Sequence, residues 1–144
     1  MANPYTIEFY EDNHGREPAL AFMRSLPQSK KAAIGVALHE FLGKFGPDVV
    51  QTDFGKALGD GLYEFRLDQN AEQVLRKAGK SPKPEEDDTK ILLRVFFHAH
   101  GNKLILLLSG YDKAEHTSRS YQNAQIEQAR TYLKDWKTRV KVKT

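Results

Sequence analysis

Two apolar segments that lie close together in the second half of the chain constrain the fold most. Residues 91–99 ("ILLRVFFHA") and residues 103–111 ("KLILLLSGY") each have the length and the apolar content of a strand. Gly101 and Asn102 between them can supply the positive φ angles of a tight turn. We therefore expect an antiparallel hairpin, and the alternating segment Leu62–Leu67 ("LYEFRL") predicts a third strand beside it.

Apolar residues at helical spacing predict helices on either side of these strands. Residues 34–45 repeat apolar side chains at i, i+3 and i+4, which predicts an amphipathic helix of about 17 residues that ends at the following Gly-Pro pair. Residues 16–27 predict an earlier helix, and residues 123–140 predict a closing one. A short first strand is expected at residues 6–10.

The expected order of elements is β-α-α-β-β-β-α, which places the chain in the α+β class. A three-stranded antiparallel meander would pack one face on the two early helices and leave its other face partly open. Residues 53–61 ("DFGKALGDG") predict a turn-rich connection. Residues 69–90 would form a flexible insertion, in which "AEQVLRKAG" predicts a short helix closed by Gly79. Residues 80–88 ("KSPKPEEDD") predict a solvated loop whose deletion leaves the fold intact.

Size and composition suit a single domain that covers residues 1–144. Of these residues 40% are hydrophobic and 28% are charged, as in ordinary globular proteins. The chain has no cysteine, which excludes disulfides and thiolate metal sites and fits the reducing cytoplasm, where we expect the protein to act. No leader pattern and no apolar run of the roughly 20 residues that a membrane helix needs is found, so we expect no membrane partner.

The charge balance is compatible with a nucleic-acid partner but does not require one. The net charge is +3 and the pI is about 9.0. His98 and His100 lie two residues apart on one expected strand face, but cysteine is absent and no carboxylate lies beside them. We therefore expect no metal site and no cofactor.

Strand alternation predicts which polar side chains share the open face of the sheet. Glu64 and Arg66 lie on one face of their strand. In the next strand, Arg94 lies on the face that points away from the core residues Val95 and Phe97. In the last strand, alternation places Tyr111 and Lys113 on the same face as Ile105, Leu107 and Ser109. We expect Arg66, Arg94, Tyr111 and Lys113 to converge on one concave surface that suits a phosphate. The alternative is that each arginine is a rim residue or pairs with a nearby carboxylate such as Glu64.

Three segments, "GLYEFRLD", "ILLRVFFHAHGNKLILLLSGYDKAEHTS" and "QIEQARTYLKDW", together carry a family resemblance. In their order and spacing the chain resembles the RelE/ParE superfamily of toxins from type II toxin-antitoxin systems, most closely its phage-derived, HigB-like branch. The likeness covers nearly the whole chain. It implies a RelE-like (microbial RNase-like) fold and an mRNA interferase, an endoribonuclease that cleaves mRNA in the ribosomal A site and so inhibits translation.

The resemblance also implies a mechanism and partners. Cleavage would use the 2′-hydroxyl of the RNA as nucleophile, without metal, and would require a general base, a general acid and charge stabilisation of the phosphorane. The partners would be the ribosome, mRNA and a cognate antitoxin, which we expect to be a helix-turn-helix protein.

Site residues follow from the matching positions. Arg66, Arg94 and Lys113 match basic positions of the family and are the expected phosphate ligands. His116 is the expected titrating group, since histidine changes charge closest to neutral pH, but "AEHTSRSYQ" departs from the family pattern and leaves the acid and the base open. The other expected RNA-binding residues are Lys56, Tyr111, Arg119 and Tyr121, the tyrosines by stacking on a base.

Two other functions remain open from the sequence. Within the superfamily, a ParE-like inhibitor of DNA gyrase would bind a protein and cut no RNA. From another class, a noncatalytic RNA-binding or protein-binding module of a phage or mobile element would also suit a basic sheet face. Because Arg94 is expected to face away from the core, we expect Arg94→Ala to abolish growth inhibition by a toxin and to leave the fold intact.

Overall fold

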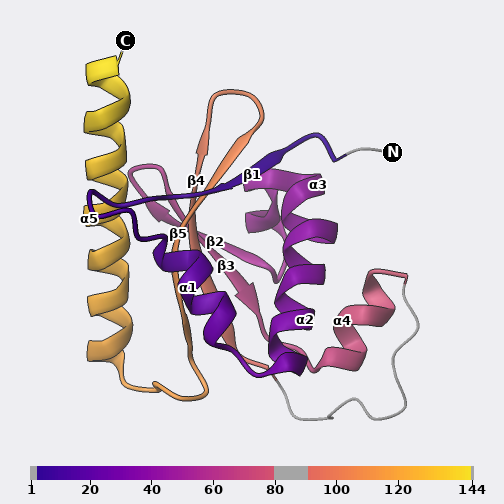
Figure 1. Cartoon of the computed structure of the whole chain (residues 1–144). Coiled ribbons are helices and arrows are strands. Elements are labelled where there is room, and N and C mark those ends of the chain that lie inside the picture. The colour runs from indigo at the N-terminus through magenta and orange to yellow at the C-terminus, as the bar shows by residue number, and fades with distance from the viewer. Residues whose placement is uncertain (1–2, 80–90, 144) are drawn as a thin grey trace.

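The computed structural model describes residues 3–79 and 91–143 and contains one five-stranded sheet with the order β1-β5-β4-β3-β2 (Figure 1). The strands are β1 (Thr6–Phe9), β2 (Gly55–Gly59), β3 (Leu62–Leu67), β4 (Leu93–His100) and β5 (Leu104–Asp112). Strands β2 to β5 form an antiparallel meander, and β1 pairs with β5 in parallel. The expected α+β class is confirmed, with a mixed sheet.

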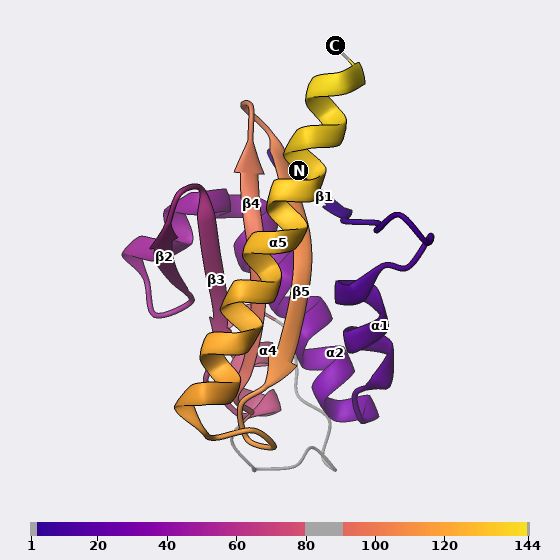
Figure 2. The ribbon, with the colours of Figure 1, turned by 90° about the vertical axis from the view of Figure 1, so that its left-hand side faces the viewer.

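Helices cover both faces of this sheet. Helices α1 (Pro18–Ser25), α2 (Gln28–Ala37) and α4 (Ala71–Lys77) lie on one side. The long α5 (Arg119–Lys143) runs diagonally across the other side (Figure 2). The expectation of a partly open second face is therefore corrected, because α5 packs on it through Ala129 and Leu133.

The sheet has a strand that the sequence patterns missed. Strand β2 falls in the segment expected to be turn-rich, and it pairs Gly55 with Phe65 and Lys56 with Glu64. Glycine, lysine and alanine have low strand propensity, and an edge strand with exposed residues shows no apolar alternation. The meander therefore has four strands. The turn expected in this segment is present at Asp60 and Gly61, which join β2 to β3 and have φ angles of +56° and +83°.

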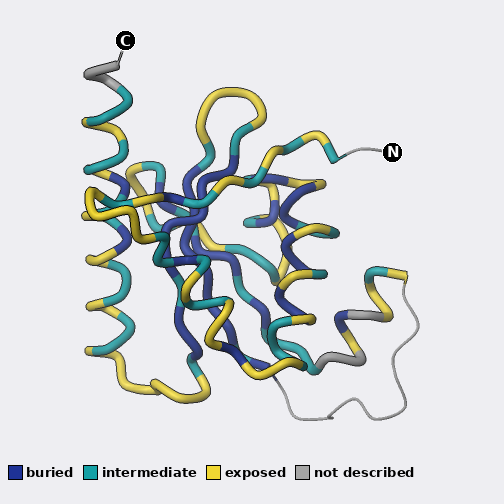
Figure 3. The backbone as a smooth tube through the Cα atoms, in the orientation of Figure 1, coloured by how far each residue is buried: buried dark blue, intermediate teal, exposed yellow. Residues whose placement is uncertain are grey.

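Each face of the sheet contributes to its own apolar core, which explains why the three central strands β3, β4 and β5 are mostly buried (Figure 3). Alternate residues of β3 and β4 point to opposite sides, as the sequence predicted. The core under α1 and α2 includes Phe65, Leu67, Leu93, Val95, Phe97, Ile105 and Leu107. The core under α5 includes Leu62, Phe96, Leu106, Leu108 and Tyr111.

A β-bulge in β5 changes which of its residues share a face. Phe97 pairs with Leu107, but Phe96 pairs with Ser109, so that Leu108 is an extra residue. The bulge moves Ser109 and Tyr111 to the α5 side and leaves Gly110, which pairs with Val95, on the α1 side near Phe22. The expectation that Ile105, Leu107, Ser109, Tyr111 and Lys113 form one set is therefore wrong, whereas the expectation that Tyr111 accompanies Arg94 is confirmed.

The predicted helix at residues 34–45 is present but not uniform. Helix α2 continues through a π-helical turn (Leu38–Leu42) into α3 (Gly43–Phe45) and ends, as expected, at Gly46, which has a φ of +54°. A Cβ atom on Gly46 would lie 2.4 Å from the ring of Tyr5, so glycine is required here for space as well as for conformation. A 3₁₀ helix (Gly46–Gln51) leads from there toward β2.

The first part of the insertion forms helix α4. Asn70 caps α4 by accepting a hydrogen bond from the backbone N–H of Gln73, and Val74 is fully buried in the core under α1 and α2. Gly79 follows the helix with a φ of +76°, so the expected short helix is confirmed. The expected acidic loop at residues 80–88 lies outside the described residues.

Candidate functional site

The predicted arginine cluster lies where β3 and β5 end, β4 begins and α5 starts. Arg66 on β3 pairs in register with Arg94 on β4, which in turn pairs with Tyr111 on β5. Directly opposed residues on neighbouring antiparallel strands project to the same face, here the face that α5 covers. The structure therefore brings together Arg66, Arg94 and Tyr111, three of the four residues expected to converge.

Two carboxylates hold these arginines in an ion-pair network. Arg66 Nε lies 2.8 Å from Glu64 Oε1, and Arg94 Nε lies 3.9 Å from the same oxygen. Arg94 Nη1 donates to Asp68 Oδ1 at 2.6 Å and to the carbonyl oxygen of Leu93 at 3.1 Å. Both Glu64 and Arg94 are buried. The carboxylate pairing that the sequence offered as an alternative is thus present in the structure.

The two arginines differ in what they can offer a ligand. The side chain of Arg66 is 34% exposed, whereas that of Arg94 is only 4% exposed. Arg66 lines a cavity of about 380 Å³ together with Asp68, Gln69 and the segment Thr52 to Gly55. An anion that enters this cavity can reach Arg66, while Arg94 acts from behind by fixing Glu64 and Asp68.

Aromatic side chains extend the site from the arginines toward α5. The ring of Tyr111 lies 6.0 Å from that of Phe96 and 5.7 Å from that of Tyr121. Burial, with a further contribution from the nearby Glu64 charge, raises the pKa of Tyr111 to about 12. Because Tyr111 is buried, the half-buried Tyr121 is the tyrosine that a base could reach.

His116 stands at the far end of this aromatic row. Its imidazole stacks on Tyr121 at 4.0 Å with an interplanar angle of 11°, and it remains exposed. Its backbone N–H donates to the carbonyl oxygen of Asp112 at 3.1 Å, which fixes the loop before α5. Tyr111, Tyr121 and His116 border a second cavity, of about 340 Å³, whose wall includes the ion pair of Lys30 with Asp112 at 2.5 Å.

The remaining predicted residues lie around this centre. Lys56 on β2 is opposite Glu64 and is exposed, so it joins the same face. Arg119 is exposed at the first residue of α5. Lys113 follows β5, and its backbone N–H donates to Leu92, but no ion pair joins its side chain to the network among residues 3–79 and 91–143.

Two carboxylates of this site were not predicted as functional. The alternation that placed Arg66 on this face also placed Glu64 there, so its position was readable from the sequence. Asp68 lies just after β3, where alternation no longer applies, and its contact with Arg94 joins residues 26 positions apart in the sequence. No local pattern could have indicated that contact.

His98 and His100 lie at the opposite end of β4. His98 Nδ1 donates to the carbonyl oxygen of Gly61 at 2.7 Å, and burial lowers the pKa of its imidazole. In the described part of the chain, no group of three or more histidine, aspartate or glutamate side chains is arranged to hold a metal ion. No helix of that part is long and apolar enough to cross a membrane.

Comparison with known proteins does not add an identity to this geometry. The chain matches no protein-family model and no curated protein sequence. A functional assignment therefore depends on the motifs and on the site itself.

Proposed function

We propose that the chain is a toxin of a type II toxin-antitoxin system, of the RelE/ParE superfamily and its HigB-like branch, with a RelE-like fold. It acts as an endoribonuclease on ribosome-bound mRNA in the cytoplasm and inhibits translation until a helix-turn-helix antitoxin neutralises it. The observation that carries the proposal is the group of Glu64, Arg66 and His116 around one end of the sheet. It contains a carboxylate, an accessible guanidinium and an imidazole, the three chemical functions that metal-free RNA cleavage needs.

Each group has a role in a balanced reaction. Glu64 accepts the proton of the 2′-hydroxyl as the 2′-oxygen attacks the adjacent phosphorus. Protonated His116 gives its proton to the 5′-oxygen as the phosphorus–oxygen bond breaks. The products are a 2′,3′-cyclic phosphate and a free 5′-hydroxyl. The step leaves Glu64 protonated and His116 neutral, and proton exchange with water returns both groups to their starting states.

The other residues stabilise charge and hold geometry. Arg66 reaches the developing negative charge of the phosphorane because its side chain is the more exposed of the two arginines. Arg94 is a positioning residue that keeps the Glu64 carboxylate in place. Tyr121 offers a ring face to a flanking base, and Lys56 and Arg119 lie where the RNA backbone would continue.

The test is the chemistry of the cut ends on programmed ribosomes. We expect a 2′,3′-cyclic phosphate on the upstream fragment, whereas a 3′-hydroxyl with a 5′-phosphate would contradict the proposed mechanism. Glu64→Gln, Arg66→Gln and His116→Gln should each lower the cleavage rate by about 10²-fold or more. Arg24→Gln on the exposed surface of α1 is the matched control and should cleave like the wild type.

One observation favours a second candidate, the noncatalytic binding module. Both arginines pair with carboxylates and Arg94 is buried, so the site holds less free positive charge than the sequence predicted. If purified protein leaves ribosome-bound mRNA intact yet binds RNA, this reading replaces the first. If it leaves mRNA intact but blocks DNA supercoiling by gyrase, the ParE-like reading does.

A further inference from the structure

A third cavity lies on the face of the sheet that α5 covers and is lined by none of the residues of the arginine network. It has a volume of about 720 Å³ and lies between the C-terminal half of α5, the end of β4 and the β2–β3 turn. His100, which lines it, is six residues from Arg94 along β4, or roughly 20 Å in a strand. The cavity is therefore separate from the proposed cleavage site, and its volume is in the range of small-molecule sites.

Its walls combine apolar surface with an aromatic corner. Leu133, Val140 and Trp136 of α5 supply the apolar side. The rings of Trp136 and His100 lie 4.9 Å apart at an interplanar angle of 81°, so they form two perpendicular walls. The ring of His98 also packs against Trp136, with the ring centres 5.8 Å apart. A planar ring that enters the cavity can stack on one wall and meet the edge of the other.

The rim of the cavity is positive. Arg130, Lys134 and Lys137 line it from α5, and Asp60 supplies the one carboxylate among its described lining residues. Arg130 is engaged with the β2–β3 turn, donating to the carbonyl oxygens of Leu58 and Gly59 at 2.7 and 3.1 Å. Lys134 and Lys137 are exposed and form no ion pair within residues 3–79 and 91–143. These two ammonium groups are available to an anion.

We propose that this cavity binds a nucleotide, with the base against Trp136 and His100 and the phosphate held by Lys134 and Lys137. A flat ring joined to a compact anion matches an aromatic corner with two cations at its edge. An acidic peptide would satisfy the charges, but it would leave the perpendicular ring walls without a planar partner. The nucleotide is either a free mononucleotide or one residue of an RNA chain, and only the second source depends on the proposed function.

The protein carries its own probe for this site, because Trp136 is its only tryptophan. Fluorescence excited at the tryptophan band is titrated with adenosine monophosphate, with adenosine, with ribose 5-phosphate and with a short 2′-O-methyl oligonucleotide. The methylated oligonucleotide has no nucleophilic 2′-hydroxyl, so binding is measured whether or not the protein cleaves RNA. We expect saturable quenching by the monophosphate or by the oligonucleotide, and weaker binding of adenosine and of ribose 5-phosphate.

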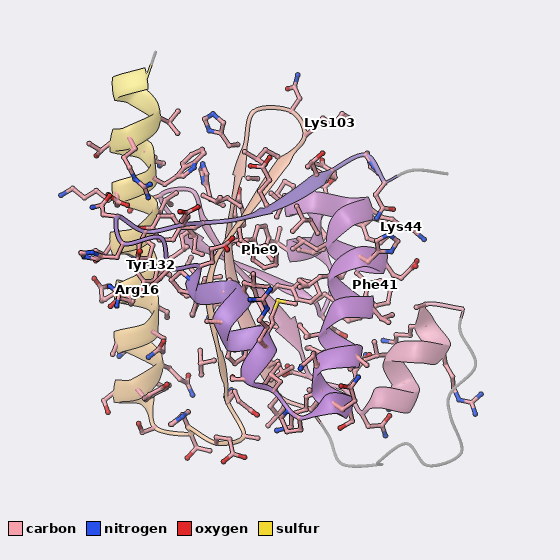
Figure 4. All side chains as sticks on the ribbon, viewed as in Figure 1. Phe9, Arg16, Phe41, Lys44, Lys103 and Tyr132 are labelled. Carbon is pink, nitrogen blue, oxygen red and sulfur yellow. The ribbon has the colours of Figure 1, made fainter. Side chains whose placement is uncertain are left out.

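Matched variants separate this site from general charge attraction. The double variant Lys134→Ala/Lys137→Ala should raise the dissociation constant about tenfold or more, and His100→Ala should raise it severalfold. The control Lys31→Ala/Lys44→Ala removes the same charge from the opposite side of the sheet, where Figure 4 places Lys44, and should bind like the wild type. Circular dichroism confirms that each variant is folded.

The outcomes distinguish the possibilities. Quenching by the monophosphate supports a site for free nucleotides, and quenching by the oligonucleotide alone supports an RNA subsite. Absence of quenching by both, or quenching that the Lys134/Lys137 double variant does not weaken, overturns the proposal. Binding of an acidic peptide without binding of any nucleotide also overturns it and assigns the cavity to a protein partner. A protein that binds the oligonucleotide but cuts no mRNA would reject the proposed function and leave this inference standing.

Discussion

Removal of the Arg94 guanidinium should destabilise the fold as well as the site. In Arg94→Ala, the Glu64 carboxylate, whose side chain is 6% exposed, keeps only Arg66 as an ion-pair partner, and Asp68 loses the 2.6 Å contact with Arg94. Breaking a buried ion pair costs about 3–5 kcal/mol when the remaining buried charge is left without a partner, whereas Glu64 here keeps its 2.8 Å contact with Arg66. Asp68 is 38% exposed and can be solvated again, so we expect the lower end of this range, about 3 kcal/mol.

This loss is large enough to measure in two ways. At about 2–4 °C per kcal/mol for a domain near this size, the melting temperature should fall by roughly 6–12 °C. Urea denaturation followed by the fluorescence of Trp136 gives the free energy of unfolding directly. Arg24→Ala, at an exposed position on α1, is the control and should change that free energy by less than about 0.5 kcal/mol.

A double variant tests the stated cause. The cycle compares Arg94→Met, Glu64→Gln and the double variant that carries both. In the double variant the buried Glu64 charge is removed together with Arg94, so its loss of stability should be smaller than the sum of the two single losses by about 1 kcal/mol or more. Strict additivity, or a melting temperature of Arg94→Ala within 2 °C of the wild type, would refute the buried ion-pair argument. The sequence alone predicted that Arg94→Ala leaves the fold intact, whereas the structure predicts a less stable protein. Loss of growth inhibition in Arg94→Ala could therefore come from unfolding and is not by itself evidence for catalysis.

The structure also makes two predictions away from the site. Gly46→Ala should lower the free energy of unfolding by about 1–3 kcal/mol, since its Cβ would meet the Tyr5 ring at a positive φ. Gly35→Ala, which has open space around it in α2, should raise that free energy by about 0.5–1 kcal/mol. Equal effects of the two substitutions in urea denaturation would contradict this. Tyr10→Phe removes the 2.6 Å hydrogen bond to Asp135 that lowers the pKa of this carboxyl, so it should cost about 1 kcal/mol at pH 7. A carboxyl whose pKa is lowered in the folded state stabilises the fold at pH values above its unfolded pKa, and this stabilisation is lost as the carboxyl is protonated in acid. The difference in melting temperature between Tyr10→Phe and the wild type should therefore shrink as the pH falls from about 5 to 3. A gap that stays constant over this range would contradict the assignment.

The sequence predicts which side chains share a face where both faces of a strand are apolar, or where charged residues occur on only one face. That condition holds for β3 and β4, so the shared face of Glu64, Arg66 and Arg94 was predicted correctly. It fails for β2, where a Cβ atom on Gly55 would lie 2.7 Å from the backbone of Val49, so that space rather than strand propensity explains the glycine. Edge strands of this kind are defined by a partner strand, which only the three-dimensional fold supplies.

The bulge in β5 shows a second limit of sequence patterns. Leu106, Leu107 and Leu108 are chemically alike, so nothing in their order marks Leu108 as the extra residue. The bulge follows from the requirement that Ile105 and Leu107 fill the core under α1 and α2 while Tyr111 faces α5. Ion pairs such as that of Arg94 with Asp68 also cannot be predicted from sequence patterns. This pair joins the end of β3 to the start of β4, and the insertion separates the two residues in the sequence.

The two proposed sites share one structural support, helix α5. Its first turn presents Tyr121, on which His116 stacks, and its last turns present Trp136 beside His100. Between them, Ala129 and Leu133 pack the helix onto Phe96, Leu106 and Leu108 of the sheet. Tyr10 and Arg139 add a polar anchor at the C-terminal end through Asp135. A ligand that contacts Trp136 therefore binds the same helix that positions Tyr121. If both sites bind the same RNA, α5 sets the distance between the nucleotide held at Trp136 and the phosphate that faces Arg66.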